Sequence, residues 1–208
     1  MSAFKQRPEM GRRRTNGRRV PAPVAAVNSA GNFPPTVSRP ALLDKSGDKR
    51  FRQLVYDLLT IANRMTVVRE HLGRRLKISG PQYSVLMAIM QLQGDKGVGV
   101  SALARLLHVS TAFVATETGK LGQVGLVTKR ADPDDGRAVR LSLTRAGRAQ
   151  IDRNGAEIRA INDTFFGALN ASTFATLSNI MATLVLSSDI AIAQISSSTE
   201  LESRAAAE

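Results

Sequence analysis

VGVSALARLLHVSTAFVATETGKLGQVGLVTKRADPDDGRAVRLSLT, residues 98–144, is the stretch that decides the fold. It holds two short segments with helical spacing of apolar residues, a turn at 109–110, and two β-prone runs joined by ADPDDG. Two short helices separated by about three to four residues and followed by a hairpin are typical of a winged helix-turn-helix. We therefore expect a mainly α-helical protein with a small β-hairpin wing.

The ends of these elements carry recognisable signals. A strand is expected at 98–100, and Ser101 is expected to cap the first helix, while Gly125 ends the second. In the second strand of the hairpin, alternation places Val139, Leu141 and Leu143 on one face.

Two more helices are predicted before this stretch. Residues 48–76 repeat apolar side chains at helical spacing behind Asp48, a plausible N-cap, and their polar face is rich in arginine. The next helix starts at Ser79, has Pro81 in its first turn and ends at Gly94. Because this helix is apolar on most sides, it should be central and buried.

Two long helices are predicted after the hairpin. Thr144 is expected to cap the first, and the second starts near residues 170–172. The second helix has a long apolar stripe formed by Phe174, Leu177, Ile180, Met181, Leu184 and Ile190. We expect residues 199–208 to be frayed.

The charge is concentrated near the N-terminus. The 208 residues include 29 Lys and Arg against 17 Asp and Glu, and residues 1–50 alone carry a net +8. Residues 1–45 are rich in Arg and Pro and are predicted to be disordered. Such a tail either adds salt-sensitive affinity for phosphates or is a dispensable extension, even one from a misassigned start codon before Met10.

Several classes of site are disfavoured by composition. Cysteine is absent, which fits a reducing cytoplasm and excludes disulfides and thiolate metal sites. No apolar run of about 20 residues or secretory signal is found, so no membrane segment is expected. His71 and His108 are the only histidines and no phosphate-binding glycine loop is present, so neither an enzyme nor a cofactor is expected.

The second helix of the helix-turn-helix is the candidate recognition helix. Its polar residues Ser110, Thr111, Thr116 and Lys120 are candidates for contacts with bases or phosphates in a major groove. Ser110 and Thr111 have capping as an alternative role, while Phe113, Val114 and Leu121 are interpreted as core residues.

The wing offers a second candidate DNA contact. Arg137 lies just past the turn, where a guanidinium can enter a narrow, negative minor groove. Asp135 could brace that arginine or a neighbouring one. The alternative is an exposed surface ion pair that adds little to stability.

The chain resembles the MarR family of bacterial winged-helix regulators between about residues 50 and 198. The resemblance is carried by SGPQYSVLMAI, by SALARLLHVSTAFVATETGKLGQVGLVTKR and by DPDDGRAVRLSLTRAG. The last segment is the most specific, because the family's wing has D-x-R followed by Leu-Thr-x-x-Gly. The corresponding residues here are Asp135, Arg137, Leu143, Thr144 and Gly147.

This resemblance implies a domain at 46–198, with the winged helix at about 79–144. It implies a cytoplasmic, nucleoid-associated homodimer paired through helices near 48–60 and 155–198. The partner would be double-stranded DNA with a palindromic operator. The expected function is repression, released by a small effector such as an aromatic acid or an acyl-coenzyme A.

The resemblance also suggests an effector site. Arg64, Arg69, His71 and Tyr83 are the candidate ligand-binding residues, since Arg and His suit an anion and Tyr offers apolar area with a hydroxyl. Each of these side chains has an ordinary alternative, as a solvated residue, a cap or a core residue.

Three positions depart from the family pattern. Thr116 stands where an arginine is common, Gly119 is unusual inside a helix, and Gly136 replaces a frequently basic wing residue. Two other functions stay open at this point: a ligand-insensitive DNA-binding or nucleoid-organising protein, and a small-molecule-binding or catalytic protein without a nucleic-acid role.

Overall fold

The computed structural model describes residues 34–132, 135 and 138–205. Within them the chain divides into two units, Met1–Leu54 and Val55–Glu208, with the boundary inside helix α1, Lys49–Arg75.

In the first unit, a short 3-10 helix η1, Pro40–Leu42, precedes the start of α1. The backbone N–H and the hydroxyl of Thr36 each donate to Asp48 Oδ2 at 2.7 Å, and Arg52 pairs with Oδ1 at 2.8 Å. These bonds stabilise the carboxylate and lower the pKa of Asp48. The prediction that the whole of residues 1–45 is disordered is therefore wrong for residues 34–45, because Asp48 fixes this segment through Thr36.

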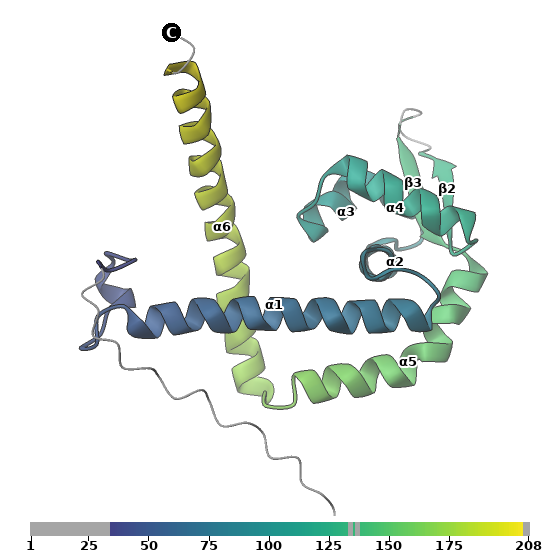
Figure 1. The fold of residues 1–208 in the computed structure, drawn as a ribbon. Coiled ribbons are helices and arrows are strands. Elements are labelled where there is room, and N and C mark those ends of the chain that lie inside the picture. The colour runs from purple at the N-terminus through teal and green to yellow at the C-terminus, as the bar shows by residue number, and fades with distance from the viewer. Residues whose placement is uncertain (1–33, 133–134, 136–137, 206–208) are drawn as a thin grey trace, which may run out of the picture. The chain divides into compact units, whose positions relative to one another are not determined.

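The second unit contains the rest of α1, the remaining helices and a small sheet (Figure 1). Its elements are α2 Gly80–Leu92, β1 Val98–Gly99, α3 Val100–Leu107, α4 Thr111–Gln123, β2 Val127–Ala131, β3 Val139–Leu143, α5 Arg145–Phe165 and α6 Ala171–Ala205. The mainly α fold with a β-hairpin wing is confirmed.

Helix α2 is the centre of the core. Ser79 Oγ accepts from the N–H of Gln82, whose side chain accepts in return from the N–H of Ser79, so the predicted cap is a complete capping box. Val85, Leu86 and Ile89 are fully buried, as the apolar sequence predicted.

Helix α3 begins two residues earlier than predicted. Gly99 is its N-cap residue and Val100 its first residue, so the assignment of Ser101 as the cap is wrong. The reason is that Gly99 pairs with Arg140 in the sheet, and this extended residue leads directly into the helix. At the other end, His108 takes a left-handed conformation with φ 50° and ends the helix.

The sheet is antiparallel with strand order β1-β3-β2. Leu141, at the middle of β3, pairs with Val98 on one side and Lys129 on the other and is fully buried. Gln93 Oε1 accepts from the N–H of Leu143 at 2.8 Å, which ties the end of α2 to β3.

The junction between the sheet and α5 explains the Leu-Thr-x-x-Gly pattern. Thr144 Oγ1 donates to the carbonyl of Gly125 at 2.7 Å and accepts from the N–H of Gly147 at 2.9 Å. A Cβ on Gly147 would collide with the carbonyl of Leu126. Thr144 is thus the predicted cap of α5, and Gly147 permits the close contact between α5 and the start of β2.

The buried core belongs to the winged helix and the helix ends that adjoin it. Its apolar members are Leu72, Leu76, Ile78, Tyr83, Val85, Leu86, Ala88, Ile89, Val98, Leu103, Ala104, Val114, Leu121, Leu126, Val127, Leu141, Leu143, Ile151 and Ile158. Val139, predicted on the same face as Leu141, is 37% exposed because it lies towards the tip of the wing.

Helix α6 contrasts with this core, since each of its residues 171–199 is exposed. The helix also continues to Ala205, past the predicted start of fraying. By length and composition alone, the 29-residue segment Ala171–Thr199 is able to cross a membrane, since a window within it reaches a mean hydropathy of 1.5. The search for an apolar run of about 20 residues missed this helix, and the expectation of no membrane segment stays a prediction. A single helix of this kind is weak support for a membrane span, because apolar helices of soluble proteins pass the same test.

Candidate nucleic-acid interface

Helix α4 is anchored to the core by one face. Val114, Thr118 and Leu121 are fully buried, and Thr118 Oγ1 donates to the carbonyl of Val114 at 2.8 Å. Ser110 Oγ accepts from the N–H of Phe113 at 3.1 Å, which confirms its alternative role as the N-cap. The helix is therefore held rigidly, with its opposite face available to a partner.

The opposite face of α4 carries the predicted base-contacting residues. Ser110, Thr111, Thr116 and Lys120 are all exposed. The structure brings these four together on one element, and their contact with DNA stays a prediction.

Two charged residues of α4 form an ion pair that sequence reasoning did not find. Lys120 Nζ lies 2.7 Å from Glu117 Oε1, and the Glu117 side chain is only 8% exposed while that of Lys120 is 52% exposed. The i,i+3 spacing was the available signal. Lys120 thus reaches solvent with part of its charge already balanced.

The wing is the hairpin of β2 and β3, which packs beside α4 (Figure 1). Near the turn of the hairpin, Arg140 Nε donates to Asp132 Oδ2 at 2.6 Å, and Asp132 is buried. The Asp132 N–H donates to the carbonyl of Ala138 at 2.9 Å. These bonds hold the two strands in register up to the edge of the turn.

The wing residues proposed from the sequence lie at this turn. Asp135 is exposed, and its carbonyl accepts from the N–H of Ala138 at 2.9 Å. Arg137 lies outside the described residues, so the pairing of Asp135 with Arg137 stays a prediction. Sequence reasoning missed Asp132, whose cross-strand position opposite the start of β3 was the signal for its pairing with Arg140.

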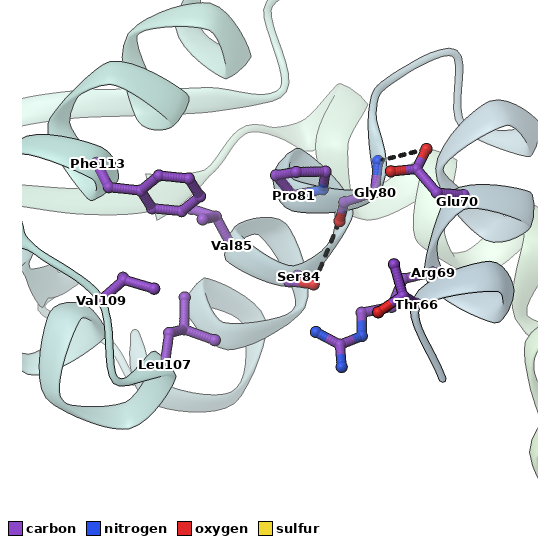
Figure 2. A pocket seen from close by; sticks show the side chains of 10 residues that line it. All are labelled: Thr66, Arg69, Glu70, Gly80, Pro81, Ser84, Val85, Leu107, Val109 and Phe113. Atoms are coloured by element: carbon purple, nitrogen blue, oxygen red, sulfur yellow. Dashed lines mark hydrogen bonds between the residues drawn. The ribbon is translucent and has the colours of Figure 1, made fainter. Parts of the chain in front are cut away.

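A pocket of about 210 Å³ lies between the end of α1 and the helix-turn-helix (Figure 2). In Figure 2, Thr66, Arg69 and Glu70 of α1 face Leu107, Val109 and Phe113 across the start of α2. Glu70 Oε2 accepts from the N–H of Gly80 at 3.3 Å, so one wall of the pocket is fixed to the N-terminus of α2. The pocket thus combines an exposed guanidinium with an apolar wall.

The four predicted ligand-binding residues have different positions. Arg69 lines the pocket, whereas Arg64 is an exposed residue of α1 outside its lining. His71 Nε2 lies 2.9 Å from Glu157 Oε1 of α5. Tyr83 is 7% exposed within the core, and burial raises the pKa of its hydroxyl. Of the four, only Arg69 is among the residues that line this pocket.

Phe113 was assigned to the core, and that assignment is wrong. Its side chain is 36% exposed and forms part of the pocket wall. Helical spacing is a weak signal for this residue, because Phe113 lies on the flank of α4, between its buried and outer faces. Pro81 and Ser84 also line the pocket and were not identified as site residues.

Comparison with known proteins gives a family and a fold. A model described as MarR family matches residues 71–138. No curated protein matches the chain. The chain is similar to the crystal structure of a probable transcriptional regulator from Pseudomonas aeruginosa, with 27% sequence identity and a TM-score of 0.51, covering 62% of this chain and 96% of that one.

Two more distant structures share the fold. A mutant MarR from E. coli complexed with operator DNA is 19% identical, with a TM-score of 0.55 over 65% of this chain and 95% of that one. Bordetella bronchiseptica BpsR, whose DNA binding is regulated by 6-hydroxynicotinic acid, is 20% identical, with a TM-score of 0.53 over 64% of this chain and 98% of that one.

Proposed function

The chain belongs to the MarR family of winged-helix transcription regulators, and from this premise we propose that it is a homodimeric repressor released from its operator by an anionic aromatic ligand. The observation that carries the DNA-binding part is α4 itself, anchored by Val114 and Leu121 with Thr111 and Thr116 exposed on its outer side. This presentation suits insertion into a major groove beside a wing at the minor groove.

The dimer is proposed from the uncovered apolar surface of the terminal helices. Leu54 and Leu59 of α1 are 51% and 56% exposed, and Phe174 and Ile180 of α6 are 60% and 51% exposed. Apolar surface of this extent favours a second copy of the chain as its cover. We assign the pairing to residues near 48–60 and 155–198, and a two-fold dimer then calls for an inverted-repeat operator.

The effector is proposed to bind the pocket beside Arg69. A carboxylate would pair with the guanidinium, and an aromatic ring would lie against Pro81, Leu107 and Phe113. Phe113 belongs to the first turn of α4, the same turn that presents Thr111. A ligand that binds better when Phe113 is displaced would therefore move the recognition helix and lower the affinity for DNA by that difference.

The DNA-binding proposal is tested with the full chain and a fluorescent palindromic duplex obtained by selection from random double-stranded DNA. We expect binding to survive an excess of unrelated competitor DNA, and Arg137→Ala to weaken it by tenfold or more while the circular dichroism spectrum is unchanged. Arg148→Ala is the matched control, because it removes the same charge from an exposed position in α5 outside the proposed dimer interface. Enrichment of no sequence would contradict the proposal.

The ligand proposal is tested by adding aromatic acids and their coenzyme A thioesters to the protein–DNA complex. Arg69→Ala should abolish release by the effective compound but leave DNA binding intact. Arg64→Ala tests the second candidate arginine, which lies outside the pocket, and we expect its response to be unchanged. Release that is equal in wild type and Arg69→Ala would rule out this pocket as the effector site.

A second function, a ligand-insensitive nucleoid protein, is favoured by one observation, the net charge of +8 on residues 1–50. Clustered arginines give sequence-independent, salt-sensitive affinity. In the selection experiment this alternative predicts binding that competitor DNA removes completely. The preferred function predicts a specific complex that remains.

A further inference from the structure

The outer face of α4 is unusual in having very small side chains. Away from the buried residues Val114 and Leu121, the exposed positions of the outer face in the first two turns are Thr111, Ala112, Ala115 and Thr116, and the half-buried Gly119 follows on the same face. The larger Phe113, which is also exposed, lies on the flank of the helix and lines the pocket beside Arg69. Between Thr111 and Gly119 this surface consists of methyl groups, two hydroxyls and backbone.

Such a face lacks the groups that recognise guanine. Guanine is read in the major groove mainly by the two donors of an arginine or by a lysine. The sequence of α4 contains no arginine, and its single cation, Lys120, is paired with Glu117 at 2.7 Å. The contact that methyl groups make best is apolar, and the 5-methyl group of thymine is the apolar feature of the major groove.

Gly119 provides a second, independent observation. A glycine inside a helix costs about 1 kcal/mol of stability relative to alanine, so its presence needs a reason. A Cβ built at Gly119 would have no atom of the described chain within 4 Å. The packing of the protein therefore gives no reason for glycine, whereas a partner that approaches the backbone closely at this point does.

We propose that α4 lies unusually deep in the major groove and reads thymine methyl groups through Ala112, Ala115 and Thr116, with Gly119 at the point of closest approach. The operator half-sites are then A·T-rich where α4 meets the bases. This inference rests on the proposed function of DNA binding and specifies which bases the protein recognises.

The first test separates this inference from the function on which it rests. Random double-stranded DNA is selected with the full-length protein, and the enriched half-site is then remade with uracil in place of single thymines. Uracil pairs as thymine does but lacks the 5-methyl group, so we expect about a fourfold loss of affinity at each contacted position. Uracil substitution in the flanking sequence is the matched control.

Two different failures can be told apart. Enrichment of no sequence would contradict the proposed DNA-binding function, and this inference with it. An enriched half-site that is rich in guanine, or that is insensitive to uracil, would overturn the methyl-reading inference and leave the function standing.

A pair of substitutions at Thr116 assigns the contact to its methyl group. Thr116→Val keeps a methyl and removes the hydroxyl, whereas Thr116→Ser keeps the hydroxyl and removes the methyl. We expect the valine variant to retain the sensitivity to uracil at one thymine and the serine variant to lose it. The reverse pattern would show that Thr116 acts through a hydrogen bond.

Gly119→Ala tests the close approach. We expect the substitution to raise the melting temperature, since alanine favours a helix, and to weaken binding to the selected duplex about tenfold. Gly122→Ala is the control in the same helix, because its Cβ would lie 3.7 Å from the carbonyl of Val127 and so face the protein's own sheet. Equal affinity of Gly119→Ala and wild type would overturn the deep position of α4.

Discussion

Helices α2 and α6 are both strongly apolar, yet they have opposite surroundings. In α2, Val85, Leu86 and Ile89 are fully buried by the winged helix. In α6, every residue from 171 to 199 is exposed. Apolar composition therefore predicts only that a helix must pack against another apolar surface. The tertiary structure decides whether that surface belongs to the same chain, as for α2, or is left to a partner, as for α6.

The same substitution in both helices gives the largest expected difference. Leu86→Ala should lower the free energy of unfolding by about 2–5 kcal/mol, because it leaves a cavity in the core. Leu186→Ala, at a position that is 66% exposed and on the opposite side of α6 from Leu177, Met181 and Leu184, should change it by less than about 0.5 kcal/mol. Urea denaturation followed by circular dichroism measures both variants. Equal losses would mean that this side of α6 is also buried in solution.

This contrast marks the limit of what the sequence could predict about the fold. Local signals were sufficient for the capping box at Ser79, for Thr144 as the cap of α5 and for the hairpin, because each depends on residues a few positions apart. Ser101 was assigned wrongly as a cap, since the sheet pairing of Gly99 with Arg140 decides where α3 starts. The prediction of disorder for residues 34–45 was wrong for a similar reason. The bonds that order this segment run from Thr36 to Asp48, twelve positions apart, and no local pattern indicates them.

The candidate site divides in the same way. The exposed residues of α4 could be predicted because they follow from one helix and its buried face. The pocket could not, because its lining comes from α1, α2, α3 and the start of α4, including the residues Arg69, Ser84 and Phe113. A sequence shows which of these side chains are polar or apolar, but not that they converge.

The second prediction concerns the cover of α6. If a second copy packs on the stripe that includes Leu177, Met181 and Leu184, then Leu184→Asp would place a charge in an apolar interface. We expect the dissociation constant of the dimer to rise about 100-fold or more. Sedimentation over a range of protein concentrations measures this. Asn179→Asp, on the opposite side of the helix, adds the same charge and should leave the dimer intact.

If the wild-type protein were a monomer at all concentrations, a second copy of the chain would be excluded as the partner of α6. The apolar stripe of α6 would then need another partner, and the membrane becomes the relevant test because of the length and hydropathy of Ala171–Thr199. Co-sedimentation with phospholipid vesicles would examine that outcome directly. A dimer that does not bind the vesicles supports the packing of α6 against a second copy of the chain.

The smallest expected effect concerns a polar contact between helices α1 and α5. Glu157 Oε1 lies 2.9 Å from His71 Nε2, and Oε2 accepts from Arg75 Nε at 2.7 Å. These hydrogen bonds, that of His71 first, lower the pKa of Glu157 from its ordinary value of 4.5. The carboxylate is thus more readily ionised in the folded protein than in the unfolded chain.

The direction of the pH effect follows from this lowered pKa. The stabilisation is fully present above the ordinary value of 4.5 and is lost as the pH falls through the lower pKa of the folded state. Glu157→Gln should therefore reduce stability at pH 6 to 7 and make stability decline less steeply below pH 4.5, which urea midpoints across this range would measure. Asp152→Asn, which removes an exposed carboxylate from the same helix, is the control. If Glu157→Gln and wild type declined in parallel, the contact of Glu157 with α1 would contribute nothing to stability in solution, and the remaining contacts, among them the bond of 2.7 Å from Gln150 Nε2 to the carbonyl of Leu76, would hold α5 in place.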